Sequence, residues 1–144
     1  MGKIVMGGHF VLTVKDLKKS SKWYKEILGW LGFSVAFEDK RNVYFKSKDF
    51  TEYIAIFQGH NEFVNDKFDR YRVGFHHLAF RADKKETVDK FYKFLKRKKV
   101  VVTEKPQHFP DYGDELYYAV FFSDPDELRL ELFFEMNTET KNTH

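Results

Sequence analysis

The sequence predicts an α+β protein made of two βαβββ modules, each with a mostly antiparallel sheet covered by one helix. Three observations lead to this fold class. The chain has 144 residues, which is the size of one domain. Its two halves resemble each other, and strand-like and helix-like hydrophobic patterns follow in the same order in both. We therefore expect a single domain over residues 1–144 with an internal duplication.

The duplication is visible when the chain is shifted along itself. At a shift of 68 residues, His9 falls on His77, and the triplet WYK at 23–25 falls on FYK at 91–93. A histidine pair and two aromatic pairs thus match at the same shift. This indicates that the two halves begin with equivalent elements.

The ends of the halves match at a larger shift. Ile54–Phe57 falls on Leu130–Phe133 at a shift of 76 residues, so the second half holds 76 − 68 = 8 extra residues. The stretch 104–115, with two prolines and one glycine, is the expected loop that contains them. The predicted organisation is module one at 4–58, a linker at 59–73, module two at 74–135 and a polar tail at 136–144.

Each module begins with a strand followed by a helix. Phe10, Leu12 and Val14 alternate with His9, Val11 and Thr13, which is the pattern of a strand with one apolar face. An apolar stripe at helical spacing follows Asp16 and ends near Gly29 and Gly32. Residues 77–80 and a stripe at 88–95 repeat this order. The remaining strands are expected around residues 35–37, 43–46, 53–57, 100–103, 117–122 and 129–134.

Composition excludes several classes of protein. The chain has no cysteine, which excludes disulfide scaffolds, thiolate zinc sites and cysteine nucleophiles. The formal charge is 25 − 22 = +3 and the lysines are scattered along the chain, so no nucleic-acid partner is expected. The sequence contains no run of 18 apolar residues, so no membrane span is expected. The first eight residues do not resemble a signal peptide. A cytoplasmic location is expected.

Strand alternation predicts which side chains share a face. The apolar residues of each strand should pack under the helix, so His9, His77 and Glu131 should lie on the opposite face of matching strands. Two imidazoles and one carboxylate with open positions are a ligand set typical of Fe(II) and suitable for Mn, Co, Ni or Zn. The alternative is that the histidines are structural and that Glu131 pairs with Arg81 or Arg129.

Three motifs carry a resemblance to a known superfamily. They are HFVLTVKDL at 9–17, GFHHLAF at 74–80 and FFSDPDELRLEL at 121–132. The chain resembles the vicinal oxygen chelate proteins, which include glyoxalases, bleomycin-resistance and fosfomycin-resistance proteins, and extradiol dioxygenases. The resemblance implies that the modules form an open cup and that a divalent metal binds at His9, His77 and Glu131.

Two positions depart from the pattern of this superfamily. Glu127 stands where the closing turn usually has glycine. Ala55, the first-half counterpart of Glu131, stands where the four-ligand glyoxalase I enzymes carry a glutamate that is both ligand and base. The resemblance therefore implies a three-ligand enzyme (a lyase, transferase or dioxygenase) and not the four-ligand glyoxalase I mechanism.

The expected substrate is a small molecule that binds the metal through vicinal oxygens. Arg81 is the candidate for attracting an anionic substrate group, and a tyrosine is the candidate acid or hydrogen-bond donor. One of Tyr117 and Tyr118 should face the site, and we take Tyr118 as the catalytic candidate although the sequence leaves the choice open. A metal-free protein that sequesters a small molecule and a regulatory module are the alternatives. Superfamily resemblance also implies a homodimer.

Overall fold

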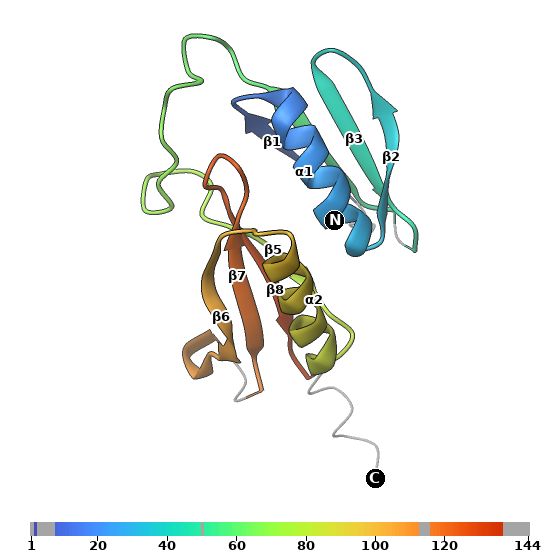
Figure 1. The fold of residues 1–144 in the computed structure, drawn as a ribbon, viewed down its shortest axis with the longest axis vertical. Coiled ribbons are helices and arrows are strands. Elements are labelled where there is room, and N and C mark those ends of the chain that lie inside the picture. The colour runs from blue at the N-terminus through green and yellow to red at the C-terminus, as the bar shows by residue number, and fades with distance from the viewer. Residues whose placement is uncertain (1, 3–7, 50, 113–115, 137–144) are drawn as a thin grey trace. The chain divides into compact units, whose positions relative to one another are not determined.

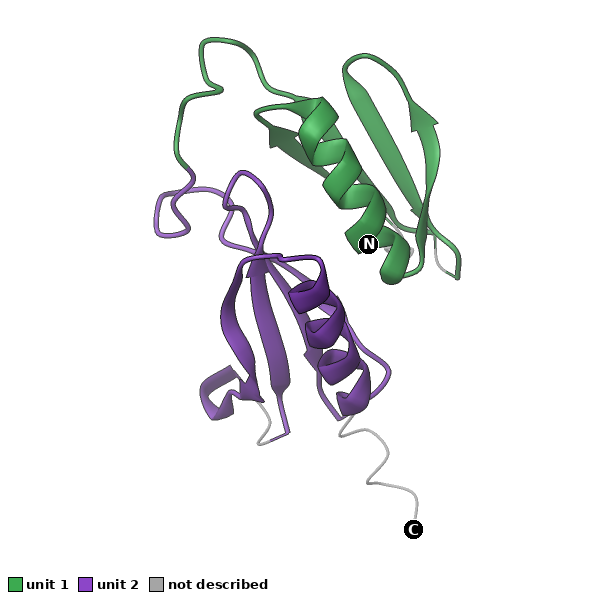
Figure 2. Ribbon diagram, in the orientation of Figure 1, with its two compact units in different colours: residues 1–67 green, residues 68–144 purple. Residues whose placement is uncertain are grey.

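The computed structural model describes residues 2, 8–49, 51–112 and 116–136 of the chain. The chain divides into two compact units, residues 1–67 and 68–144 (Figures 1 and 2). The boundary falls within the segment 59–73 that the sequence predicts as the linker. The predicted polar tail lies outside the described residues except for Met136.

The first unit is one βαβββ module. Its elements, in chain order, are β1 (His9–Val14), α1 (Leu17–Trp30), β2 (Phe33–Glu38), β3 (Asn42–Ser47) and β4 (Tyr53–Gln58). The strands form a sheet in the order β1-β4-β3-β2, in which β1 runs parallel to β4 and the other neighbours are antiparallel.

The second unit repeats this arrangement. Its elements are β5 (Leu78–Arg81), α2 (Lys85–Arg97), β6 (Val102–His108), the short 3₁₀ helix η1 (Pro110–Tyr112), β7 (Tyr118–Ser123) and β8 (Arg129–Phe134). The sheet order is β5-β8-β7-β6, with β5 parallel to β8. The predicted α+β class with two βαβββ modules is confirmed, and each sheet is mixed and open.

Local sequence explains where α1 begins and which side it buries. The Asp16 carboxylate accepts a hydrogen bond from the Lys19 backbone N–H, which satisfies one free donor of the first turn. Leu17, Tyr24 and Leu28 are then buried against the first sheet. The helix places one face of this sheet in the core and leaves the other face open.

The second core is built in the same way around α2. Val88, Phe91 and Leu95 are fully buried, and the Phe91 ring packs edge-on against Phe122 of β7 at 5.2 Å between ring centroids. Because Phe122 points to the helix, its neighbour Phe121 points to the opposite face of the sheet. This alternation positions the candidate functional residues.

One predicted boundary is wrong. We expected a strand ending at 103 and a loop over 104–115, whereas β6 continues to His108 and pairs with β7 through Gln107 and His108. Register shifts on either side of Glu104 let the strand accommodate additional residues. Pro106 lies on an edge strand, where a missing N–H costs no sheet hydrogen bond.

None of the described helices is long and apolar enough to cross a membrane.

The turn between β7 and β8 contains a strained residue. The Asp124 carboxylate accepts hydrogen bonds from the backbone N–H groups of Asp126 and Leu128 and holds the turn closed. Glu127 completes the turn at a φ of 67°, in the left-handed region that favours glycine.

We expect Glu127→Gly to raise the free energy of unfolding by about 0.5–1 kcal/mol, because glycine adopts a positive φ without steric cost. Chemical denaturation measures the change. The matched control is Lys22→Gly, at an exposed position inside α1, which should lower the stability by about 1 kcal/mol. A Glu127→Gly protein as destabilised as the control would contradict this account of the turn.

Candidate functional site

The candidate site lies in the second unit, on the face of its sheet that is turned away from α2, which we call the open face. Glu131 is at its centre and is only 1% exposed. Its backbone pairs with Ala79 of β5 on one side and with Phe121 of β7 on the other. A carboxylate is therefore buried in the middle of the sheet, where it requires polar partners.

His77 and Tyr117 supply those partners. The Tyr117 hydroxyl donates a hydrogen bond to Glu131 Oε1 at 2.5 Å. His77 Nε2 lies 3.2 Å from Glu131 Oε2. The two oxygens of one carboxylate thus face one side chain each. A second histidine, His76, has its Nδ1 2.6 Å from Nδ1 of His77.

Burial shifts the protonation equilibria of all three groups. It raises the pKa of Glu131, although the hydrogen bond from Tyr117 and the positive charge of Arg129 oppose the rise. It lowers the pKa of His77, with smaller contributions from the charges of His76 and Arg129. The pKa of Tyr117 is raised by burial and by its hydrogen bond to Glu131, so this hydroxyl keeps its proton and acts as a donor.

A buried ion pair lies beside this cluster. Arg129 Nη2 contacts Glu104 Oε1 of β6 at 2.6 Å, and the guanidinium lies 3.9 Å from the centre of the Phe121 ring. Arg129 Nε is buried and has no hydrogen-bond partner within the described part of the chain. The positive charge of Arg129 acts on Glu131 and opposes the rise of its pKa.

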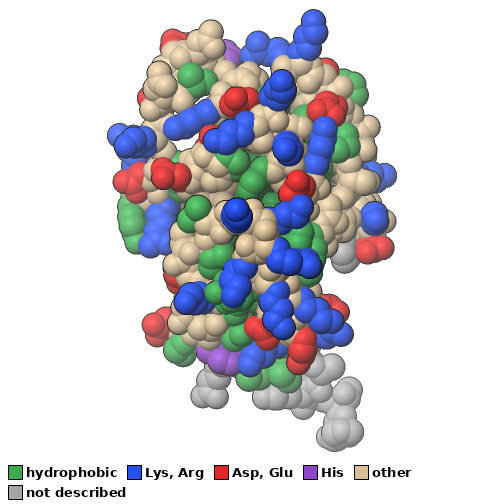
Figure 3. All heavy atoms as spheres, viewed as in Figure 1, with side chains coloured by type: hydrophobic (Ala, Val, Ile, Leu, Met, Phe, Trp, Pro, Cys, Tyr) green, Lys and Arg blue, Asp and Glu red, His purple; other side chains and the backbone are tan. Residues whose placement is uncertain are grey.

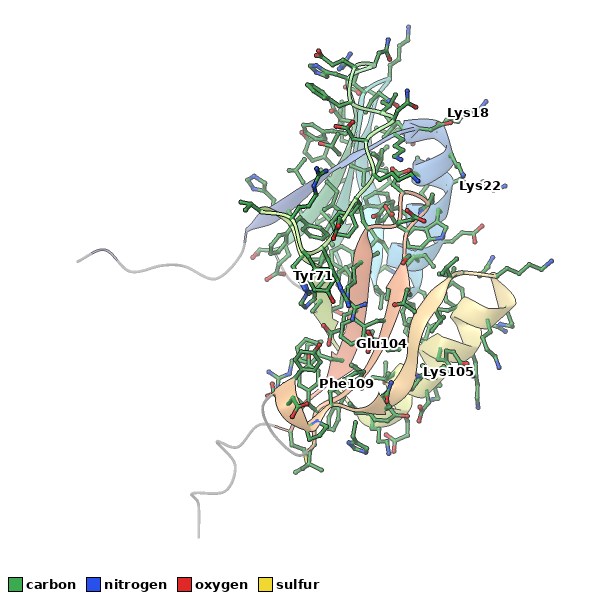
Figure 4. All side chains as sticks on the ribbon, turned by 90° about the vertical axis from the view of Figure 1, so that its left-hand side faces the viewer. Lys18, Lys22, Tyr71, Glu104, Lys105 and Phe109 are labelled. Carbon is green, nitrogen blue, oxygen red and sulfur yellow. The ribbon has the colours of Figure 1, made fainter. Side chains whose placement is uncertain are left out.

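Aromatic rings surround the polar cluster. Tyr117 stacks on Phe133 with 5.0 Å between centroids and 7° between planes. Phe121 packs edge-on against Phe109 at 5.3 Å and lies near Tyr112. Figure 4 labels Glu104 of β6, Phe109 directly after β6, and Tyr71 in the segment before β5. The open face therefore offers a polar centre within an aromatic wall.

The structure brings together two of the three predicted metal ligands. His77 and Glu131 are in contact, as described above. His9 is exposed at the first position of β1 in the first unit, where its backbone pairs with Tyr53. Within residues 8–49, 51–112 and 116–136, no group of three or more His, Asp or Glu side chains is arranged to hold a metal ion.

Tyr118, the catalytic candidate from the sequence, lies on the helix side of the sheet and not on the open face. Tyr118 pairs with Phe134 and points to the helix side, where its hydroxyl donates to Asp89 of α2 at 2.7 Å. Burial and this hydrogen bond raise its pKa to about 12. Because successive residues of a strand face opposite sides, Tyr117 is the tyrosine of the open face.

Arg81 lies at the edge of the open face and is tied to the end of β8. Its Nη2 donates to the Glu135 backbone carbonyl at 3.0 Å and lies 4.0 Å from the Glu135 carboxylate. The Glu135 carboxylate therefore competes with any anionic substrate group for this guanidinium. The predicted role of Arg81 stays a prediction.

The pairing of Glu104 with Arg129 is a feature that the sequence did not indicate. Glu104 was assigned to a loop, so no strand register was available to place it opposite Phe121. Residues 104–107 (EKPQ) show no apolar–polar alternation, and Pro106 is a residue that sheets admit only at edges or irregular positions, so the sequence held no clear signal for a longer β6.

The chain matches the family model "Glyoxalase/Bleomycin resistance protein/Dioxygenase superfamily" over residues 8–132. It belongs to this superfamily. The uncharacterized protein YqjT of Bacillus subtilis (strain 168) is 34% identical over 124 residues, which cover 86% of this chain and 94% of YqjT. The recognition made from the motifs is confirmed.

Solved structures show the same fold. A presumed glyoxalase from Bacillus halodurans has a TM-score of 0.75 and 27% identity, covering 88% of this chain and 93% of its own. The fosfomycin resistance protein FosX of Listeria monocytogenes has a TM-score of 0.69 and 20% identity, covering 95% of this chain and 98% of its own. The superfamily thus includes enzymes and small-molecule resistance proteins.

We expect Tyr117→Phe to raise the pKa of Glu131, because the lost hydrogen bond favours the ionised carboxylate. Tyr118→Phe is the matched control, since its hydroxyl contacts Asp89, and it should leave the Glu131 pKa unchanged. An NMR titration of the labelled glutamate side chain measures both. An equal shift in the two variants would contradict the assignment of the tyrosines to opposite faces.

Proposed function

We propose that this protein is a cytoplasmic metalloenzyme of the superfamily that binds a small substrate through two neighbouring oxygens at a divalent metal ion. The observation that supports this most directly is the pair formed by His77 and the buried Glu131. Burial removes the hydration of the Glu131 carboxylate, and one hydrogen bond from Tyr117 and one contact with His77 replace only a small part of it. A divalent cation would stabilise the buried charge much more strongly.

The donor set fits a divalent metal in its chemistry. His77 offers an imidazole nitrogen whose lowered pKa keeps it neutral near pH 7, and Glu131 offers a carboxylate oxygen 3.2 Å away. His9 is proposed as the third ligand because it is the counterpart of His77 in the repeat. Ala55 offers no ligand atom, so three protein ligands leave open positions for the substrate.

When bound, the ion would supply Lewis-acid activation of the substrate oxygens or, if it is iron, reactivity with dioxygen. The residues of this chain have separate tasks. The protonated Tyr117 hydroxyl can donate a hydrogen bond or a proton to the substrate, and it takes the role first assigned to Tyr118. The aromatic wall around Phe121 and Phe133 excludes water from the polar centre.

A metal-free binding protein is the second candidate. The wall contributed by Phe109, Tyr112 and Phe133 favours it, because stacked and edge-on rings can hold an apolar or planar ligand without a metal. The two candidates differ in whether the ligand binds to protein from which metal has been stripped.

We expect the stripped protein to bind one Fe(II), Mn(II), Co(II), Ni(II) or Zn(II) ion per chain by isothermal titration. His77→Ala should weaken the affinity at least about 100-fold, because an inner ligand is lost. His76→Ala is the matched control and should change it much less. Unchanged binding in His77→Ala with loss in His76→Ala would transfer the ligand role to His76, and stoichiometric ligand binding without metal would favour the second candidate.

We also propose that the protein is a homodimer, in which the metal site is completed either within one chain or between two. Edge strands β1, β2, β5 and β6 carry backbone groups that a second copy can cover. Sedimentation at micromolar concentration should give about twice the chain mass of 17.3 kDa. A monomer that still binds the metal would contradict the dimer and leave the metal site standing.

A further inference from the structure

One segment of the second unit is strongly positive. Residues 84–99 contain eight lysine and arginine residues and two acidic residues, a net charge of 8 − 2 = +6. The whole chain has a net charge of +3, so the remaining residues carry 3 − 6 = −3. This segment contains the helix α2 and its C-terminal end.

The helix gathers this charge on its outer side. Val88, Phe91 and Leu95 occupy the inner side and are fully buried against the second sheet. Five exposed side chains define what we call the basic face, and blue side chains gather over α2 in Figure 3. These residues are Lys85, Lys90, Lys93, Lys96 and Arg97.

Helix stability does not explain the basic face. Lys96 and Arg97 are favourably placed near the negative end of the helix dipole, but Lys85 lies in the first turn, where a positive charge is unfavourable. The N-cap, Lys84, makes no capping hydrogen bond with its side chain. Glu86 in the first turn and Asp83, which accepts a hydrogen bond from the Thr87 hydroxyl, favour this end of the helix, whereas Lys84 and Lys85 do not.

Glu86 and Asp89 lie among these basic residues on α2, and the net charge of the face is positive. Within the described part of the chain, none of its five side chains forms an ion pair with a carboxylate. Asp89, which shares the helix, accepts the hydrogen bond from the Tyr118 hydroxyl. Lys85 and Lys96 lie instead over the rings of Tyr118 and Tyr92, at 4.5 and 5.1 Å from the centroids. These charges are available to a polyanion.

We propose that the basic face of α2 binds the phosphate backbone of double-stranded nucleic acid without reading its sequence. From Lys85 to Arg97 the helix extends about 18 Å, and a duplex presents roughly ten negative charges over that length. Four of the five side chains are lysines, which act as point charges toward phosphate, whereas base recognition relies on arginine and amide pairs.

An anionic membrane fits the basic face less well. A helix that lies on a membrane inserts an apolar side, and the apolar side of α2 is already buried against its own sheet. The sequence predicted no nucleic-acid partner because lysines occur throughout the chain. Helical periodicity brings the lysines of residues 84–99 onto one surface of α2. A basic surface of this kind is typical of proteins that bind nucleic acid.

The test is fluorescence anisotropy of the full chain with a labelled 20-base-pair duplex of arbitrary sequence, repeated at increasing salt concentration. We expect a Kd of about 10⁻⁴–10⁻⁶ M near physiological salt. Engagement of five side chains predicts that log K falls against log salt with a slope of about −4.5. The triple variant Lys90→Gln, Lys93→Gln, Arg97→Gln should flatten the slope by about 2.7.

The matched control removes three charges from the other helix: Lys18→Gln, Lys19→Gln, Lys22→Gln. It should leave the slope within about 1 of the natural protein, and circular dichroism verifies that both variants fold. Equal slopes in the two triple variants would overturn the assignment to α2, because the effect would then follow net charge alone. No binding to the duplex, or binding only to phosphatidylserine vesicles, would overturn the proposal.

Discussion

The second unit depends on one constraint, which is the burial of the Glu131 carboxylate in the middle of a sheet. An ionised carboxylate in such a place loses its hydration and is stable only with donors or cations around it. Tyr117 supplies a donor to one oxygen and His77 contacts the other. Arg129 adds positive charge nearby, and Glu104 prevents that charge from being left alone. The roles of Tyr117, His77 and the pair formed by Arg129 and Glu104 thus follow from Glu131.

The same constraint links stability and function in this unit. Tyr117 and His77 are held beside Glu131 because they are its polar partners. The same contacts keep these side chains in place for a bound ligand. Burial and the hydrogen bond to Glu131 both keep the proton on the Tyr117 hydroxyl, and that proton is donated to the carboxylate. Aromatic rings pack against Tyr117 and Phe121, the neighbours of Glu131. Preorganisation of this kind is typical of binding and catalytic sites.

Much of this arrangement could be predicted from the sequence, for identifiable physical reasons. The internal repeat set the module order, and strand alternation placed His77 and Glu131 on one face, because the two-residue period of a strand is rigid. Alternation could not choose between Tyr117 and Tyr118, since both are aromatic and the run Leu116–Phe122 is apolar or aromatic at every position. It also could not extend β6 past Pro106, because the register shifts around Glu104 leave no regular pattern in the sequence.

The two modules share a fold but differ in the chemistry of their open faces. At the position of Glu131 the first module has Ala55, and at the position of Arg129 it has Tyr53. The first sheet instead carries an aromatic row, in which Phe37, Tyr44 and Phe57 pack edge-on at 6.0 and 5.7 Å. An apolar row needs no compensating charges, so this module is free of the constraint that organises the second. The duplication therefore produced one module whose open face carries an aromatic row and one whose open face carries a buried carboxylate with polar partners.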